Sequence, residues 1–171
     1  MSFEAFERAI VSDELKSVAR HWNEARGTHK MPAWVDIKPN AIAAQLPIVW
    51  AYKYDPATDS FTGRLAGERI TAIFGKSIRG LPMTDAYPGS EYPALFARTK
   101  RVVVEPAFMR GHGIVFRHLN RTGTGERIVL PLADNGEQGD GVIGATEYSL
   151  TAEPTREELA AGEILEWFAL G

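Results

Sequence analysis

The apolar positions change period along the chain, and the first period is helical. Ser12 is a candidate N-cap and Gly27 a candidate helix stop. Between them, apolar residues recur at i, i+3, i+4 and i+7, namely Leu15, Val18, Ala19 and Trp22. This spacing predicts an amphipathic helix over about residues 12–26.

Strand-like alternation follows in two groups. Residues 48–54 and 61–66 alternate from one face to the other around the turn-forming residues 55–59, which predicts an antiparallel hairpin. A second group has three extended segments separated by glycine-rich turn sequences, at residues 107–118, 127–132 and 142–150. These segments predict an antiparallel meander.

Helical spacing returns between the two strand groups and at the end of the chain. After Gly67, three residues share one helical face: Ile70, Ile73 and Phe74. After Ser90, a longer stripe is formed by Tyr92, Leu95, Phe96 and Thr99. Thr155 and Glu158 form a capping box, which predicts a final helix over about residues 155–169. Its apolar face carries Ala160, Ile164, Trp167 and Phe168.

This order keeps runs of strands apart from runs of helices. It therefore favours an α+β fold with an antiparallel sheet over a parallel α/β sheet, with helices on one face of the sheet. At 171 residues, the chain is expected to be a single domain over residues 1–171, with its core over about 30–150.

Composition excludes several classes of protein. The net charge of −3 gives no sign of a nucleic-acid partner. The chain has no cysteine, which excludes disulfides, thiolate zinc sites, a cysteine nucleophile and a flavin–cysteinyl adduct. The N-terminus lacks the features of a signal peptide, and no apolar run approaches the length of a membrane span. We therefore expect a cytoplasmic protein.

One short motif suggests a nucleotide site but fails. Gly75-Lys76-Ser77 matches the end of a phosphate-binding loop, yet the glycine required five positions earlier is replaced by Ile70. The motif also follows a helical pattern rather than a strand. Gly75 is better interpreted as a helix C-cap.

The histidines and acids give no catalytic constellation. His112 and His118 share a strand face but lie about 20 Å apart, too far for one metal ion. Haem ligation by His112 stays open. The sequence has no nucleophile elbow and no HExxH or SxxK motif. We therefore do not expect an enzyme.

Four stretches in order resemble the single-domain PAS proteins of the PAS_5 type, a family common in alphaproteobacteria. The first is "HWNEARGTHKMPAWVDIKP" before an "AQLP" helix end, and the second is "FTGRLAGERITAIFGKSIRG". The others are the later glycine and proline elements and "ERIVLPLADNG" before the last strand. The resemblance runs from about His21 to Leu150.

The resemblance implies a PAS-like five-stranded antiparallel sheet covered on one face by short helices, with N- and C-terminal flanking helices. It also implies a sensory or regulatory module that signals through protein–protein contacts. Such domains often dimerise through a terminal helix, and Leu165 and Leu170 add apolar surface to the predicted one. A homodimer is therefore expected, and the alternative is a final helix that is packed on two sides within its own chain.

A ligand pocket in this fold is expected between the concave sheet face and the covering helices. From the helices, the candidates are Tyr87, Tyr92 and Phe96. From the strands, they are Arg64, Tyr148 and three residues spaced evenly on one strand, Arg110, His112 and Phe116. For the aromatic residues the alternative is core packing, for Arg64 a structural pairing, and for Arg110 and His112 exposure to water.

Three functions remain. The leading one is a stand-alone sensor that binds a small molecule, a partner protein or both. The second is a protein-interaction adaptor whose core is solidly filled. The third is a small α+β enzyme, which needs a buried carboxylate or histidine aimed at the pocket. The sequence identifies no ligand, cofactor or partner.

Overall fold

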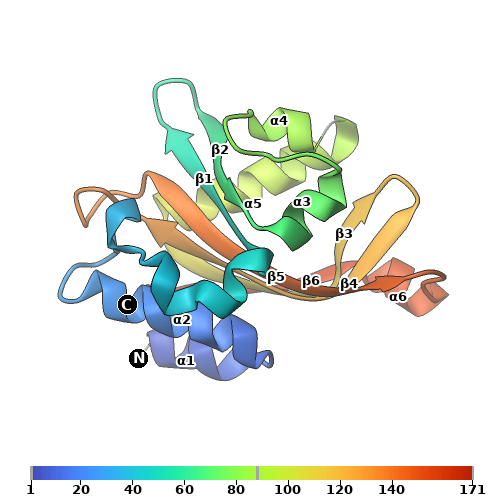
Figure 1. Cartoon of the computed structure of the whole chain (residues 1–171), viewed down its shortest axis with the longest axis horizontal. Coiled ribbons are helices and arrows are strands. Elements are labelled where there is room, and N and C mark those ends of the chain that lie inside the picture. Colours follow the sequence, from blue (N-terminus) through green and yellow to red (C-terminus); the bar gives the residue numbers. More distant parts are fainter. Residues whose placement is uncertain (1, 88, 171) are drawn as a thin grey trace.

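The computed structural model describes residues 2–87 and 89–170, and its centre is one antiparallel sheet (Figure 1). The strand order is β2-β1-β5-β4-β3-β6. The strands are β1 (Val49–Asp55), β2 (Ser60–Ala66), β3 (Ala107–His118), β4 (Arg121–Leu132), β5 (Gly141–Thr151) and β6 (Glu163–Ala169). The α+β class and the antiparallel sheet are confirmed, but the sheet has six strands rather than five.

Helices lie on both faces of this sheet (Figure 1). The α-helices are α1 (Ser2–Ala9), α2 (Asp13–Arg26), α3 (Glu68–Phe74), α4 (Met83–Ala86), α5 (Tyr92–Val104) and α6 (Arg156–Ala161). Short 3-10 segments occupy Trp34–Asp36, Pro39–Ile48 and Gly89–Glu91. The short helices α3, α4 and α5 cover one face, as the resemblance implies.

The N-terminal helices α1 and α2 cover the opposite face. Ser12 caps α2 as predicted, because its hydroxyl accepts a hydrogen bond from the Leu15 amide at 3.2 Å. Helix α1 was not predicted, yet its Phe6 ring stacks on Phe108 of β3 at 4.7 Å. Trp22 of α2 donates its indole N–H to the Pro131 carbonyl at 2.8 Å. The sheet is therefore buried on both sides, with one apolar core beneath each helical layer.

The expected final helix over residues 155–169 is wrong in its second half. Helix α6 ends at Ala161, Gly162 takes a φ of 60°, and β6 then pairs antiparallel with β3. The apolar residues of this segment fit both a helix and a strand. Ile164, Trp167 and Phe168 have the i, i+3, i+4 spacing of a helix, whereas Leu165 and Trp167 have the two-residue spacing of a strand. The edge of β3 favours the strand, because without β6 its backbone N–H and C=O groups would have no strand to pair with.

The strand form also buries apolar side chains on both sides of β6. Leu165 and Trp167 pack against the core under α5, whereas Phe168 packs against the core under α1. This alternation is what a strand with two covered faces requires. The expectation of dimerisation through a C-terminal helix therefore loses its structural basis.

Glycines explain two further local outcomes. Gly75 ends α3 with a left-handed φ of 71° and donates its amide to the Thr71 carbonyl at 2.9 Å, so the predicted C-cap is confirmed. Strand β4 begins at Arg121 rather than at residue 127, because Gly123 and Gly125 lie within the strand instead of forming a turn. A Cβ at Gly123 would lie 2.1 Å from the Phe116 ring, so that strand position needs glycine.

Candidate functional site

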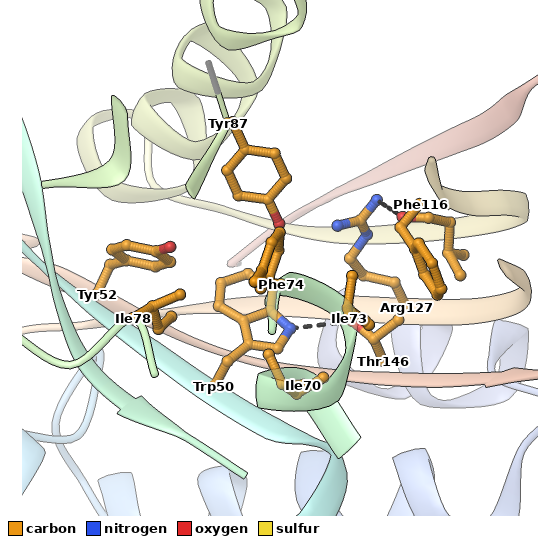
Figure 2. Close-up of a pocket in the computed structure, with 11 residues that line it drawn as sticks. Trp50, Tyr52, Ile70, Ile73, Phe74, Ile78, Tyr87, Phe116, Arg127 and Thr146 are labelled. Carbon is orange, nitrogen blue, oxygen red and sulfur yellow. Dashed lines mark hydrogen bonds between the residues drawn. The ribbon is translucent and has the colours of Figure 1, made fainter. Parts of the chain in front are cut away.

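The space between the sheet and helices α3 to α5 contains a small cavity (Figure 2). Its volume is about 20 Å³, which is room for about one water molecule. The lining residues are Trp50, Tyr52, Ile70, Ile73, Phe74, Ile78, Tyr87, Val115, Phe116, Arg127 and Thr146. The cavity lies where the sequence predicts a ligand pocket, but aromatic side chains nearly fill it.

Most polar groups of the cavity are engaged, with one exception. Trp50 donates its indole N–H to the Thr146 hydroxyl at 3.0 Å, as the dashed line in Figure 2 marks. The Tyr52 hydroxyl is buried and has no hydrogen-bond partner among the described residues. Burial raises the pKa of Tyr52, and burial also raises the pKa of Tyr87. Both phenols are therefore neutral at ordinary pH.

A larger groove of about 300 Å³ adjoins the cavity. The two share four walls, namely Tyr87, Val115, Phe116 and Arg127. The other side of the groove is formed by α5, through Leu95 and Arg98, and by the start of β6, through Gly162 and Glu163. This volume is near the lower end of the range for small-molecule sites.

An ion cluster joins three elements at the floor of this groove. Arg127 of β4 donates from Nε and Nη2 to the two oxygens of Glu163 on β6, at 3.0 and 2.5 Å. Its Nη2 also donates to the Val115 carbonyl at 2.6 Å. Arg98 of α5 reaches the same Glu163 carboxylate at 3.2 Å. The cluster therefore links the helical layer, the sheet and the C-terminal strand.

The cluster is buried and carries an excess of positive charge. The side chains of Arg127 and Glu163 are 7% and 8% exposed, and that of Arg98 is 22% exposed. Burial lowers the pKa of Arg98, and the nearby Arg127 lowers it further against the opposing effect of Glu163. Burial also disfavours charged Arg127, but pairing with Glu163 outweighs this and raises the pKa of Arg127. The single Glu163 carboxylate is therefore the shared counter-charge of Arg98 and Arg127.

Two of the sequence candidates lie at this place. Tyr87 and Phe116 line both the cavity and the groove. Tyr92 and Phe96 lie on α5 but line neither, and the Phe96 ring packs edge-on against Phe61 at 5.8 Å. Ligand contact by any of these residues stays a prediction.

Two other strand candidates, Arg110 and His112, do not join them. Arg110 and His112 face the side of the N-terminal helices, where they line a separate open groove with Ser12. The expectation that they share a face with Phe116 is wrong, because the register with β4 shifts between Ile114 and Phe116. Such a bulge inserts an extra residue and turns the following side chains to the other face.

Arg110 is held by acids on that second face. Its Nε lies 2.5 Å from Oε2 of Glu126, and its guanidinium also pairs with Glu166 of β6.

Tyr148 packs edge-on against Phe116 at 4.8 Å and donates its hydroxyl to the Arg69 carbonyl at 2.7 Å. Arg64 stacks on the Trp34 ring at 5.0 Å. The candidates are therefore divided between two faces of the sheet.

The sequence reasoning missed Arg98, Arg127 and Glu163. A signal for Arg98 was present, because it falls three residues after Leu95 and four before Val102 on the apolar stripe of α5. A charged residue in an apolar stripe predicts a buried partner. Glu163 was assigned to a helix, so its place beside Arg127 could not be seen.

The part of the chain that the structure describes lacks two further features, a metal-binding cluster and a membrane-spanning helix. Residues 2–87 and 89–170 contain no group of three or more histidine, aspartate or glutamate side chains placed to hold a metal ion. In the same part of the chain, no helix combines the length and the apolar character needed to cross a membrane.

Searches of curated proteins and of solved structures found no significant match. A family model, PAS_5, described as a PAS domain, matches residues 11–147, which span α2 to β5 and include Arg98 and Arg127. Since this match covers most of the chain, the chain belongs to the PAS_5 family of PAS domains, and its antiparallel sheet fits that family.

Proposed function

We propose that this PAS domain is a cytoplasmic sensory or regulatory module that binds a small molecule in the groove between α5, β3 and β6. The family match supports this proposal, because PAS domains are typically sensory rather than catalytic. The observation that carries the proposal is the groove itself, which holds about 300 Å³ and has Arg98, Arg127 and Glu163 at its floor. Concave, mostly apolar sites with a few convergent polar groups are where proteins bind small ligands.

The position of Glu163 suggests how binding is reported. Glu163 is the first residue of β6 and follows α6, so a ligand in the groove touches the attachment of the C-terminal segment to the core. A ligand that binds better when Glu163 has moved will favour that arrangement. We propose that a partner protein recognises the resulting change in α6 and β6, so that the signal passes through protein–protein contacts.

We also propose a homodimer, although the structure removes the C-terminal helix that was expected to form its interface. The segment expected to form a dimerisation helix is the strand β6. The intact mass of the native protein tests the dimer directly.

One observation favours the adaptor as a second candidate. The interior cavity has a volume of only about 20 Å³, so a ligand of ordinary size enters the core only if aromatic side chains move. An adaptor would use the outer surface alone and leave both the cavity and the groove without a ligand.

The geometry favours an enzyme least. Glu163 is a buried acid that lines the groove, and Arg127 and Arg98 contact its oxygens. A general base needs a free oxygen within reach of a proton on the substrate. A structural ion pair accounts better for this carboxylate.

Native mass spectrometry of protein purified gently from its own host tests the proposal. The intact mass is compared with the mass of the same sample after denaturation, which reports ligand and oligomer together. An extra mass in stoichiometric amount that disappears on denaturation supports the sensor. A bare protein at low activation energy supports the adaptor instead.

A further inference from the structure

We propose that the groove takes a small organic monoanion, a carboxylate with a compact apolar body, whose charged end binds Arg98. This inference rests on the proposed function, because it names the chemical class of the ligand in the same groove. Three observations carry it: the charge balance of the groove, the incomplete pairing of Arg98 and the apolar walls.

The charges that line the groove do not balance. The lining includes three arginines, Arg98, Arg117 and Arg127, but only two acids, Glu91 and Glu163. The groove therefore carries a net positive charge of one. A bound monoanion makes the lining neutral, whereas a cation adds to the imbalance and a dianion reverses it.

Arg98 has the capacity to bind such a group. A guanidinium has five N–H donors in a planar fork. Among the described residues, the only ion-pair partner of Arg98 is Glu163, at 3.2 Å, and this carboxylate is already held by two bonds from Arg127. The side chain of Arg98 is 22% exposed and lines the groove, so its remaining donors are within reach of a ligand.

The chemistry of a guanidinium favours a carboxylate in particular. Two parallel N–H groups match the two oxygens of a carboxylate, and such bidentate pairs are stronger than single neutral hydrogen bonds. Arg127 and Glu163 already show this arrangement beside the groove. A ligand carboxylate on Arg98 would form a second bidentate pair in the same groove.

The walls around Arg98 define the rest of the ligand. Leu95 of α5 and Ile114, Val115 and Phe116 of β3 give the groove its apolar surface. Tyr87 and Phe116 separate it from the small cavity, since both line both spaces. A ring or a short branched chain fits a groove of about 300 Å³ better than a long chain does.

Benzoate is a suitable probe, with benzamide as the neutral molecule of the same shape. Each is titrated into ¹⁵N-labelled protein, and the amide shifts are followed by NMR. We expect saturable shifts with benzoate, centred on Arg98, Phe116 and Glu163. Benzamide should bind at least about tenfold more weakly, because a hydrogen bond to a charged group is worth about one factor of ten or more.

Variants of α5 locate the charge. Arg98→Gln should weaken benzoate binding at least about tenfold, whereas Arg98→Lys, which keeps the charge, should recover part of the affinity. Lys100→Gln removes a positive charge from the same helix outside the groove, so it should leave affinity within about twofold. The amide spectrum of each variant shows whether it is folded.

The outcomes separate the ligand class from the proposed function. Equal binding of benzoate and benzamide in the groove overturns the monoanion inference but leaves a small-molecule site. An unchanged affinity in folded Arg98→Gln, or no saturable shift with benzoate, also overturns the inference. The proposed function fails on a different result, the absence of any bound mass in the native protein.

Discussion

The carboxylate of Glu163 on β6 receives two hydrogen bonds from the guanidinium of Arg127 on β4, although β6 does not neighbour β4 in the sheet. β3 lies between the two strands, and the pair crosses it where Gly111 has no side chain. A Cβ at Gly111 would lie 2.1 Å from a Glu163 oxygen. The glycine therefore allows a buried ion pair to connect the C-terminal strand to the centre of the PAS sheet.

Replacing the acid of this pair should be costly. Glu163→Gln leaves Arg127 and Arg98 buried without a counter-charge, and breaking a buried pair in this way costs about 3–5 kcal/mol. Chemical denaturation measures the loss. Glu166→Gln is the matched control on β6, because the Glu166 side chain is 41% exposed, and it should cost about 1 kcal/mol or less. Equal losses for the two variants would contradict a special role for Glu163.

The same substitution should have opposite effects at two tyrosines. Tyr52→Phe removes a buried hydroxyl that lacks a partner among the described residues, so it should stabilise the fold by about 1 kcal/mol. Tyr148→Phe removes the bond to the Arg69 carbonyl at 2.7 Å and should destabilise the fold by about 1 kcal/mol. Thermal unfolding of both variants is the measurement. A loss of stability in Tyr52→Phe would show that its hydroxyl has a partner.

The left-handed C-cap of α3 should reject a branched side chain. Gly75 has a φ of 71°, and a Cβ at this position would meet no atom within 4 Å apart from its chain neighbours, so the cost comes from the backbone alone. Gly75→Val should therefore lose about 1–2 kcal/mol of stability. Gly75→Asn should lose less in the same denaturation experiment, because asparagine tolerates this conformation. Tight ATP binding that Lys76→Ala removes would overturn this assignment of Gly75-Lys76-Ser77.

Stability should fall at alkaline pH through Tyr54. Its hydroxyl donates to Asp59 at 2.5 Å, and this bond raises the pKa of Tyr54 to about 12. Because the folded pKa lies above the ordinary value of 10, the stabilisation is complete below pH 10 and is lost as the pH rises towards 12. Ultraviolet titration of Asp59→Asn should show this phenol ionising at lower pH. An unchanged titration curve would rule out the Asp59 bond as the cause.

Local signals predicted much of the fold. Ser12 and Gly75 bound their helices where side-chain chemistry and backbone freedom indicated, and the alternating segments became strands of the expected sheet. The segment after Gly162 failed because its apolar residues fit two periods, and only the edge of β3, distant in sequence, selects the strand. No local pattern contains that information.

The candidate site was harder to predict than the fold. Tyr87 and Phe116 were identified from their aromatic character and their expected faces. Arg110 and His112 lie on the sheet face opposite to Phe116, because one bulge in β3 changes the alternation of its side chains. The ion cluster depends on side chains from α5, β4 and β6, which meet only through the sheet order.

The central claim is that the groove beside Arg98 holds a small molecule. Native mass spectrometry of the wild type and of Ala94→Trp, purified side by side from the native host, tests it most directly. Ala94 is exposed on α5 and lines the groove, so a tryptophan there fills the groove without entering the core. We predict a dissociable extra mass on the wild type and none on folded Ala94→Trp. A wild type without bound mass, or the same mass on both proteins, would contradict the account.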